Sequence, residues 1–271
     1  MNTKKIRLGL VGKELSKSPS DKIHTFILHA LGVACEYEKF SVSLAEFDDI
    51  VRVLLGDFDG FNITIPYKRD ILSHLDEIQG EAQIVGAVNT VVCPPRCGYN
   101  TDGFGFMQML KTSGVAVADK KVLLLGAGGA GRSCAVALKN AGARVFAYRR
   151  NAEELAEFCE QLGVDSVADP ETGGFDIIVN ATGVGMHDTV GKSPISKRAF
   201  VGAETAVDLI YEPQESAFLR LAKDSGVRTR VNGMAMLFYQ AYYADCLFLD
   251  RRVDEREAEE LYLKYLETEK I

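Results

Sequence analysis

A glycine-rich loop follows an apolar run in the segment KVLLLGAGGAGRS, residues 121–133. Gly126, Gly128 and Gly131 have the spacing Gly-x-Gly-x-x-Gly. This spacing allows a tight turn and lets a pyrophosphate approach the positive end of the next helix. A glycine-rich turn without a ligand has the same residues, so the triplet alone is a weak signal. The preceding strand and the following helix supply the required context. We therefore predict a dinucleotide site here.

The residues after the next predicted strand indicate which dinucleotide is bound. An acidic side chain about 20 residues beyond the loop would accept the ribose 2′-hydroxyl of NAD. The chain instead reads RVFAYRRN, with Arg149 and Arg150 at that place. A guanidinium can bind a 2′-phosphate through paired, charge-assisted hydrogen bonds. The pattern favours NADP, and the alternative is that both arginines are ordinary surface residues.

Two serines precede a predicted helix in LSKSPSDKIHTF. Ser18 stands before Pro19, which is a good first helical residue, so a structural N-cap is one interpretation. Two hydroxyls beside a helix N-terminus would also suit a small carboxylate, which makes Ser16 and Ser18 candidate ligands. This stretch alone does not decide between the two interpretations.

Lys68 follows a short strand-like run in GFNITIPYKRD, and Asp102 opens a predicted helix in YNTDGFGF. An ammonium group is a donor with no acceptor, which suits the protonation of an oxygen. A solvated lysine and a helix-capping aspartate are the ordinary alternatives. Asn89 in GAVNT is equally compatible with a turn, and Gln240 with a polar group on an apolar helix.

Strand-like and helix-like runs alternate along the chain, which predicts an α/β fold with two largely parallel sheets covered by helices. The first series comprises strands at 6–11, 35–42 and 60–65 and helices at 19–31 and 45–55. The second comprises strands at 121–125, 144–148, 177–180, 205–209 and 227–231 and helices at 131–141 and 153–162.

Two further helices are predicted at the end of the chain, the second of them an acidic amphipathic helix over 254–269. Its inward residues should be Ala258, Leu261, Tyr265 and Leu266. The turn-rich segment VVCPPRCGYNTDGFGF is a plausible boundary between the series. We predict one domain from residues 1–103 and 236–271 and a Rossmann domain from residues 104–235.

Composition excludes several classes of function. The 271 residues carry a formal net charge of −7, so a general nucleic-acid binder, which needs a basic face, is disfavoured. Neither a signal peptide nor an apolar run of the ~18 residues that a membrane span requires is evident. Six scattered cysteines indicate reduced thiols in a cytoplasmic protein. Cysteines and histidines lack zinc-ligand spacing, so no metal is expected.

Taken together, the motifs are far more specific than any one of them. The order SKSP, NITIPYK, GAVNT, NTDGFG, GAGGAGRS, NATGVGM, DLIY and GMAMLFYQA, from Leu8 to Ala241, resembles the shikimate dehydrogenase family. The resemblance implies a two-lobed NADP enzyme that interconverts 3-dehydroshikimate and shikimate in aromatic amino-acid (chorismate) biosynthesis. It also implies an active site between the lobes and C-terminal helices that return to the first lobe.

The resemblance assigns roles to individual residues. Lys68 and Asp102 match the catalytic pair, and Ser16 and Ser18 match ligands of the substrate carboxylate. Further substrate ligands would be Thr64, Asn89, Asp102, Tyr211 and Gln240. The cofactor residues would be Gly126, Ala127, Gly128, Gly129, Ala130, Gly131, Arg149, Arg150, Asn151, Thr182, Gly185, Met186, Gly233 and Met234.

This chain departs from the family pattern at several positions. Leu15 occupies the place of a histidine, Arg69 replaces the usual acidic residue after the lysine, and Arg149-Arg150-Asn151 stands where Asn-Arg-Thr is usual. A quinate/shikimate dehydrogenase with relaxed substrate or cofactor choice is one alternative, and a non-catalytic NADP sensor is another. A cytoplasmic monomer or homodimer with a small-molecule substrate is expected.

Overall fold

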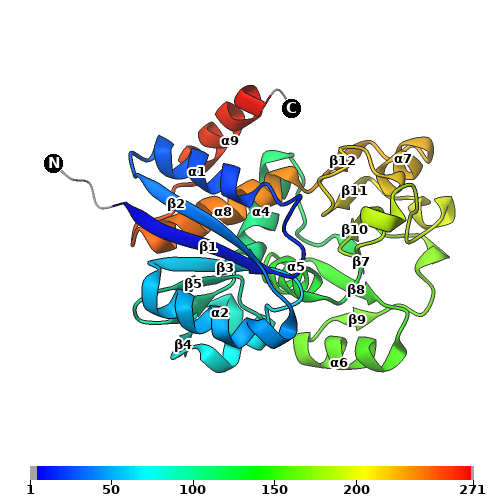
Figure 1. The fold of residues 1–271 in the computed structure, drawn as a ribbon. Coiled ribbons are helices and arrows are strands. Elements are labelled where there is room, and N and C mark those ends of the chain that lie inside the picture. The colour runs from blue at the N-terminus through cyan, green and yellow to red at the C-terminus, as the bar shows by residue number, and fades with distance from the viewer. Residues whose placement is uncertain (1–4, 270–271) are drawn as a thin grey trace. The chain divides into compact units, whose positions relative to one another are not determined.

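The computed structural model describes residues 5–269, which form two compact units. The first unit comprises Met1–Thr101 and Phe238–Ile271, and the second comprises Asp102–Leu237. Each unit has its own sheet (Figure 1). The chain therefore leaves the first unit, builds the second, and returns to complete the first.

The sheet of the first unit has the strand order β2-β1-β3-β5-β6-β4 within the described residues. Strands β1, β2 and β3 are parallel, whereas β5 pairs antiparallel with both β3 and β6. A largely parallel sheet was predicted, so the hairpin β5–β6 is a difference. Its strands lie in the segment that we interpreted as a boundary, with the Pro94-Pro95 turn between them. The strands are β1 (Ile6–Gly12), β2 (Cys35–Ser41), β3 (Gly60–Ile63), β4 (Glu77–Ile78), β5 (Thr90–Val92) and β6 (Cys97–Tyr99).

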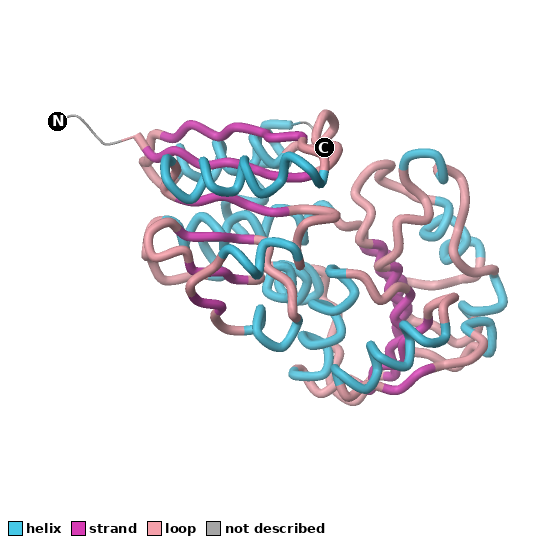
Figure 2. Tube along the Cα trace, turned by 60° about the horizontal axis from the view of Figure 1, so that its bottom comes forward, coloured by secondary structure: helices cyan, strands magenta, loops and turns pink. Residues whose placement is uncertain are grey.

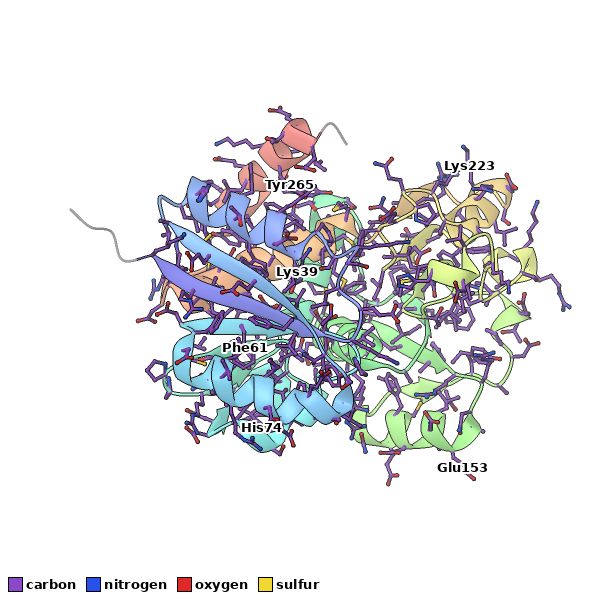
Figure 3. All side chains as sticks on the ribbon, in the orientation of Figure 1. Lys39, Phe61, His74, Glu153, Lys223 and Tyr265 are labelled. Carbon is purple, nitrogen blue, oxygen red and sulfur yellow. The ribbon has the colours of Figure 1, made fainter. Side chains whose placement is uncertain are left out.

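Alternation along the strands decides which side chains meet the helices on each face of this sheet. Phe61 and Ile63 on β3 pack in one apolar cluster with Phe47, Val51 and Leu54 of α2 (Leu44–Asp57). Phe61 lies within this unit in Figure 3. Asn62 lies between the two apolar residues and so points to the opposite face, which α1 (Ser20–Ala30) and α8 (Met234–Phe248) cover.

The last helix, α9 (Glu255–Glu269), packs on α1 through aromatic side chains. Phe26 contacts Tyr265, and Phe238 of α8 contacts both Tyr262 and Tyr265. Ala258, Leu261 and Tyr265 are buried as predicted, whereas Leu266 is only partly buried. The short α3 (Glu81–Val85) and the 3-10 turn η1 (Asp70–His74) also belong to this unit.

The sheet of the second unit has the strand order β12-β11-β10-β7-β8-β9, and every pairing in it is parallel. Figure 2 shows its strands one behind another with helices on either side. This arrangement is the predicted doubly wound layout, in which the first helix follows the glycine-rich loop. The strands are β7 (Lys121–Leu125), β8 (Arg144–Tyr148), β9 (Asp165–Ser166), β10 (Ile177–Asn180), β11 (Thr205–Asp208) and β12 (Thr229–Val231).

The helices of the second unit are α4 (Asp102–Thr112), α5 (Gly129–Asn140), α6 (Ala152–Leu162) and α7 (Ala217–Asp224), with 3-10 turns η2 (Pro170–Thr172), η3 (His187–Thr189) and η4 (Lys197–Phe200). Its core places Leu123, Ile178 and Ala206 from the sheet against Phe218 and Leu219 of α7. None of the helices among residues 5–269 is long and apolar enough to span a bilayer.

Candidate functional site

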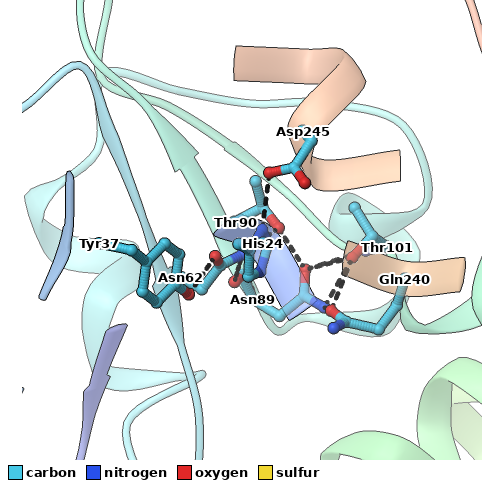
Figure 4. A network of polar contacts seen from close by, with 8 residues as sticks. All are labelled: His24, Tyr37, Asn62, Asn89, Thr90, Thr101, Gln240 and Asp245. Carbon is cyan, nitrogen blue, oxygen red and sulfur yellow. Dashed lines mark hydrogen bonds and ion pairs between the residues drawn. The ribbon is translucent and has the colours of Figure 1, made fainter. Parts of the chain in front are cut away.

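A polar cluster in the first unit joins residues from distant parts of the sequence (Figure 4). The amide Nδ2 of Asn89 lies 2.9 Å from Thr101 Oγ1 and 3.4 Å from Gln240 Oε1. Asn89 Oδ1 accepts from the backbone N–H of Thr101 at 2.9 Å and from the hydroxyl of Thr90 at 3.0 Å. Two predicted substrate residues, Asn89 and Gln240, are therefore neighbours although 151 positions separate them.

Strand geometry explains why the cluster continues across the sheet. Asn62 on β3 and Thr90 on β5 are cross-strand partners, so both side chains project from the same face. The Nδ2 of Asn62 donates to Thr90 Oγ1 at 3.1 Å and to the carbonyl of Asn89 at 3.2 Å. Tyr37 on β2 reaches across β1 and donates to Asn62 Oδ1 at 2.8 Å. Asn62 and Thr101 were missed at the sequence level, although the alternation Phe61-Asn62-Ile63 marks Asn62 as an inward polar residue.

Lys68 lies in the turn that follows β3, and its side chain is partly buried. Its carbonyl accepts the backbone N–H of Val88 at 2.8 Å, which ties this turn to the residue before Asn89. Thr64 begins the same turn. A Cβ on Gly12 would approach Thr64 within 2.5 Å and Leu15 within 2.7 Å, so both side chains lie against Gly12. The first unit thus gathers Thr64, Lys68 and Asn89 at the ends of adjacent strands.

The start of α1 differs from the predicted cap. The helix begins at Ser20 and its N-cap is Pro19, so Ser18 is not the N-cap, although Ser18 Oγ accepts the backbone N–H of Ser20 at 3.4 Å. The Oγ atoms of Ser18 and Ser20 are 3.0 Å apart, and Ser16 is exposed. Lys39, labelled in Figure 3, donates to the carbonyl of Ser18 and to Oδ1 of Asp21, both at 3.1 Å, so an ion pair lies beside Ser18. Sequence reasoning missed Lys39 because its strand is remote from α1 in the chain.

The departures from the family pattern have clear structural settings. Leu15 is 2% exposed, so an apolar side chain fills the place of the expected histidine. Its backbone N–H donates to Ser41 Oγ at 3.3 Å. Arg69 is exposed at the N-cap position of η1 and makes no capping hydrogen bond with its side chain, so its charge lies outside the core although Lys68 precedes it directly in the sequence.

A buried histidine and aspartate connect α1 to α8. Nδ1 of His24 lies 2.6 Å from Oδ1 of Asp245, with the side chains 1% and 0% exposed. Burial raises the pKa of Asp245, and the charge and hydrogen bond of His24 oppose that rise. The His24 ring stacks on Tyr37 with a centroid separation of 4.6 Å. Because 221 positions separate the pair, no local pattern could have indicated it.

In the second unit the glycine-rich loop has the geometry that a dinucleotide phosphate requires. Gly126 has φ +103°, and a Cβ on Gly131 would approach the carbonyl oxygen of Gly126 within 2.2 Å. A Cβ on Gly128 would meet no heavy atom within 4 Å, so the backbone is open on that side. No side chain caps α5, whose first turn includes Gly129, Ala130 and Gly131. The loop therefore fits the pyrophosphate of NADP.

The two arginines after β8 have different environments. Arg149 forms an ion pair with Glu154, whereas the exposed side chain of Arg150 has no hydrogen bond or ion pair with any residue in the range 5–269. Asn151 caps α6 by accepting from the backbone N–H groups of Glu153 and Glu154 at 3.0 and 3.1 Å. Arg150 is thus the better placed of the two to receive a phosphate.

The other predicted cofactor residues lie at the carboxyl ends of strands in this unit. Thr182 donates to Asn180 Oδ1 at 2.6 Å, while Gly185 has φ +119° and donates to Thr189 Oγ1 at 2.9 Å. A Cβ on Gly233 would lie 2.0 Å from the carbonyl of Leu209, so only glycine fits there. Both Met186 and Met234 adjoin these turns, at the start of η3 and of α8.

Asp102 and Tyr211 also belong to the second unit. Asp102 is the first residue of α4, is 6% exposed, and directly follows Thr101 in the chain. Tyr211 follows the end of β11 and is partly buried, and burial raises the pKa of its hydroxyl.

Asp208, in the motif DLIY, is a buried carboxylate at the end of β11. Burial raises its pKa to about 6, although three donors oppose the rise. These donors are the hydroxyl of Ser216 at 2.5 Å, the backbone N–H of Ile210 at 3.1 Å and Nδ2 of Asn180 at 3.0 Å. Asp208 therefore fixes the turns after β10 and β11, where Thr182 and Tyr211 lie.

The described residues contain no group of three or more His, Cys, Asp or Glu side chains that could hold a metal ion.

Comparison with known proteins gives a consistent result. The model of the shikimate dehydrogenase substrate binding domain matches residues 10–91. A shikimate dehydrogenase (NADP(+)) of Thermus thermophilus is 36% identical over 241 residues, which cover 88% of this chain and 90% of that protein. The corresponding protein of Caldicellulosiruptor saccharolyticus is 38% identical over 260 residues, which cover 90% and 92%.

Solved structures extend the likeness to the whole fold. The crystal structure of a Thermus thermophilus shikimate 5-dehydrogenase in complex with NADP(H) and shikimate aligns with a TM-score of 0.87 and 34% identity, and it covers 96% of this chain and 99% of that one. The shikimate 5-dehydrogenase of Listeria monocytogenes, solved with shikimate and NAD, aligns with a TM-score of 0.81 and 26% identity over 95% and 96% of the two chains.

Proposed function

The chain belongs to the family of NADP-dependent shikimate dehydrogenases, and from this premise we propose which of its residues carry the reaction. It is an oxidoreductase that acts on a CH–OH group and reversibly reduces 3-dehydroshikimate to shikimate in aromatic amino-acid biosynthesis. The observation that best supports the assignment is the direct contact of Asn89 with Gln240. Neither residue is distinctive in its own segment, yet the two are in contact, and the backbone of Val88, the residue before Asn89, binds the carbonyl of Lys68.

We assign substrate binding to polar groups of both units. Ser16 and Ser18 would bind the ring carboxylate through their hydroxyls, since Lys39 beside Ser18 already forms an ion pair with Asp21. The hydroxyls of the ring would be held by Thr64, Asn89, Asp102, Tyr211 and Gln240. Amide and hydroxyl groups suit this task because each can donate to, or accept from, a ring hydroxyl.

Lys68 is the proposed acid. NADPH, when bound, supplies the hydride for the ring ketone. The ammonium of Lys68 donates a proton to the oxygen that gains negative charge, and its position after β3 is held by the hydrogen bond from Val88 to its own carbonyl. Asp102 orients the reacting hydroxyl from the first turn of α4. In the reverse direction Lys68 accepts the proton.

The second unit is proposed to hold NADP. The loop from Gly126 to Gly131, including Ala127, Gly129 and Ala130, would bind the pyrophosphate, and Arg150 would bind the 2′-phosphate. Arg149 and Asn151 support that position through the ion pair with Glu154 and the cap of α6. Thr182, Gly185, Met186, Gly233 and Met234 would contact the nicotinamide end.

A spectrophotometric assay tests the proposal directly. NADP reduction is followed at increasing shikimate, then with quinate, and both substrates are repeated with NAD. We expect shikimate with NADP to have the highest kcat/KM. Equal efficiency with quinate and NAD would instead assign a quinate/shikimate dehydrogenase, and absence of turnover with both substrates would assign a sensor.

We also propose that the enzyme acts in the cytoplasm as a monomer or homodimer. Its six cysteines are all free, which suits a reducing compartment. Sedimentation equilibrium of the purified chain distinguishes monomer from dimer, and a larger assembly would contradict the proposal.

A further inference from the structure

A buried pair of polar side chains joins two neighbouring strands of the second unit at their carboxyl ends. Asn180 on β10 and Asp208 on β11 are partners in the parallel pairing, so both side chains project from the same face of the sheet. Nδ2 of Asn180 donates to Oδ1 of Asp208 at 3.0 Å, and both side chains are 0% exposed. Because water does not compete for this bond, the two strand ends are held firmly together.

Backbone groups determine how the amide of Asn180 is oriented, because they can act in only one way. The backbone N–H of Thr182 can only donate, so the atom that faces it at 3.1 Å must be Oδ1. The carbonyl of Val184 can only accept, so the atom that faces it at 3.3 Å must be Nδ2. Both hydrogens of Nδ2 are therefore used, one on Val184 and the other on Asp208.

The same amide shapes the turn that follows β10. Thr182 donates its hydroxyl to Oδ1 of Asn180 at 2.6 Å and accepts the backbone N–H of Val184 at 3.1 Å. Gly185 and Met186, the next proposed contacts of the nicotinamide end, follow Val184 directly in the sequence. The conformation of this turn therefore depends on where the side chain of Asn180 lies.

Asp208 also holds the turn that follows β11. Its Oδ1 accepts the backbone N–H of Ile210, the residue before Tyr211, at 3.1 Å. Its Oδ2 accepts the hydroxyl of Ser216 at 2.5 Å, and Ser216 Oγ accepts the backbone N–H of Leu219 at the start of α7. One carboxylate thus bonds the turn after β10, through Asn180, and the segment that carries Tyr211.

We propose that Asn180 and Asp208 are positioning residues for hydride transfer. Asn180 holds the turn that meets the nicotinamide end of NADP, and Asp208 fixes that turn relative to the segment of Tyr211. The inference rests on the proposed roles of Thr182, Met186 and Tyr211. Neither positioning residue needs to touch cofactor or substrate, because both act through the two turns.

Asp208 offers a matched pair of substitutions. Asp208→Ala removes both oxygens, whereas Asp208→Asn keeps one oxygen for the N–H donors of Asn180 and Ile210. Hydride transfer is sensitive to small displacements of the reacting atoms, so we expect Asp208→Ala to lower kcat about 10- to 100-fold. Asp208→Asn should keep kcat within about threefold of the wild type, because the acceptor is retained.

Binding of two ligands distinguishes a local effect at the nicotinamide end from a general loosening of the unit. Adenosine 2′,5′-bisphosphate carries the 2′-phosphate and a 5′-phosphate but has no nicotinamide. We expect Asp208→Ala to raise the Kd of NADPH about 5- to 10-fold, the factor for one lost hydrogen bond. The Kd of adenosine 2′,5′-bisphosphate, measured by calorimetry, should stay within about twofold of the wild type. Neither measurement requires turnover.

Ser216→Ala tests the cluster without removing the carboxylate, and Ser196→Ala is its control. Each serine accepts a backbone N–H at the start of a helical turn and donates to a carboxylate, but the partner of Ser196 is Glu171, outside the cluster. We expect Ser216→Ala to lower kcat roughly threefold, less than Asp208→Ala, since the bonds to Oδ1 remain. Ser196→Ala should lower the urea midpoint without changing kcat.

The outcomes are distinct. A kcat and an NADPH Kd near those of the wild type in Asp208→Ala would overturn the inference, as would equal weakening of NADPH and adenosine 2′,5′-bisphosphate. An Asp208→Asn variant as slow as Asp208→Ala would also overturn it. If Asp208→Ala does not fold, Ser216→Ala decides, and a kcat equal to that of Ser196→Ala would overturn the inference. Failure of the proposed function would appear separately, as absence of shikimate turnover in the wild-type chain.

Discussion

His24 Nδ1 and Asp245 Oδ1 are 2.6 Å apart and both side chains are shielded from solvent, so the two helices that carry them are joined by a polar bond inside an apolar interface. Asp245 Oδ2 is buried and accepts no hydrogen bond from the described residues. The carboxylate thus depends on one partner.

This dependence predicts a large loss of stability when either partner is removed alone. Asp245→Leu and His24→Phe should each lower the free energy of unfolding by about 3–5 kcal/mol, because a buried polar group loses its partner. The double variant should recover most of the loss. Urea unfolding of the wild type, the two single variants and the double variant measures the coupling free energy between His24 and Asp245. Additive effects of the two substitutions would contradict the prediction.

Lys68→Ala should lower kcat by about 100- to 10,000-fold, the usual contribution of a general acid. NADP binding, measured by titration of NADPH fluorescence, should remain close to that of the wild type. Lys120→Ala is the control, since Lys120 pairs with Glu204 at the surface of the second unit. Near-normal turnover of Lys68→Ala would remove Lys68 from the mechanism.

The two arginines should contribute unequally to cofactor choice. Arg150→Ala is expected to lower the preference for NADP over NAD roughly 10- to 100-fold, because a charged hydrogen bond to the 2′-phosphate is lost. Arg149→Ala should change the preference less, since Arg149 already pairs with Glu154. Ratios of kcat/KM for the two cofactors measure the effect, and the reverse order would reassign the phosphate ligand.

Substitutions at two glycines of the loop distinguish an effect on stability from an effect on cofactor binding. Gly131→Ala forces a Cβ against the carbonyl of Gly126 and should lower stability by about 1–3 kcal/mol. Gly128→Ala meets open space, so its stability should stay within about 0.5 kcal/mol of the wild type. Its KM for NADP should nevertheless rise roughly tenfold, equivalent to about 1.4 kcal/mol, if the pyrophosphate lies against this glycine. Unaltered NADP binding by Gly128→Ala would argue against that contact.

The raised pKa of Asp208 predicts a pH dependence of stability. A carboxyl with a pKa of 3.8 when unfolded and about 6 when folded prefers to be protonated in the folded state. The contribution of Asp208 to the free energy of unfolding is fully present below pH ~4 and is lost as the pH rises through about 6. The free energy of unfolding changes by about 3 kcal/mol over this range. The difference in unfolding free energy between wild type and Asp208→Asn should therefore decrease from pH 4.5 to 7.5. Parallel pH profiles would contradict the shift.

Apolar runs were sufficient to predict most of the parallel strands. Lys121–Leu125, Arg144–Tyr148 and Ile177–Asn180 have the predicted bounds because each is a short strand-like run that ends at turn residues. The hairpin β5–β6 was not predicted. Its strands have three residues each, too few for a clear period, and the prolines between them suggested a boundary.

Site residues within a sequence motif were predictable. Gly131 is an example, because the glycine-rich motif identifies it and a Cβ there would collide with the backbone of Gly126. Contacts between remote segments were not predictable. Lys39 beside Ser18, Thr101 beside Gln240 and His24 beside Asp245 arise only when strands and helices pack. Of the two interpretations left open for Ser18, the N-cap was wrong, because the helix starts two residues after it.

The first unit is interrupted in the chain, since Thr101 and Phe238 flank the whole of the second. During translation, α1 with His24 and β2 with Tyr37 leave the ribosome long before α8 and α9 are made. The nascent protein must therefore keep a half-covered sheet from aggregating while the Rossmann unit is synthesised and folds. The contact between Asn89 and Gln240, our proposed substrate residues, can form only once α8 has been synthesised.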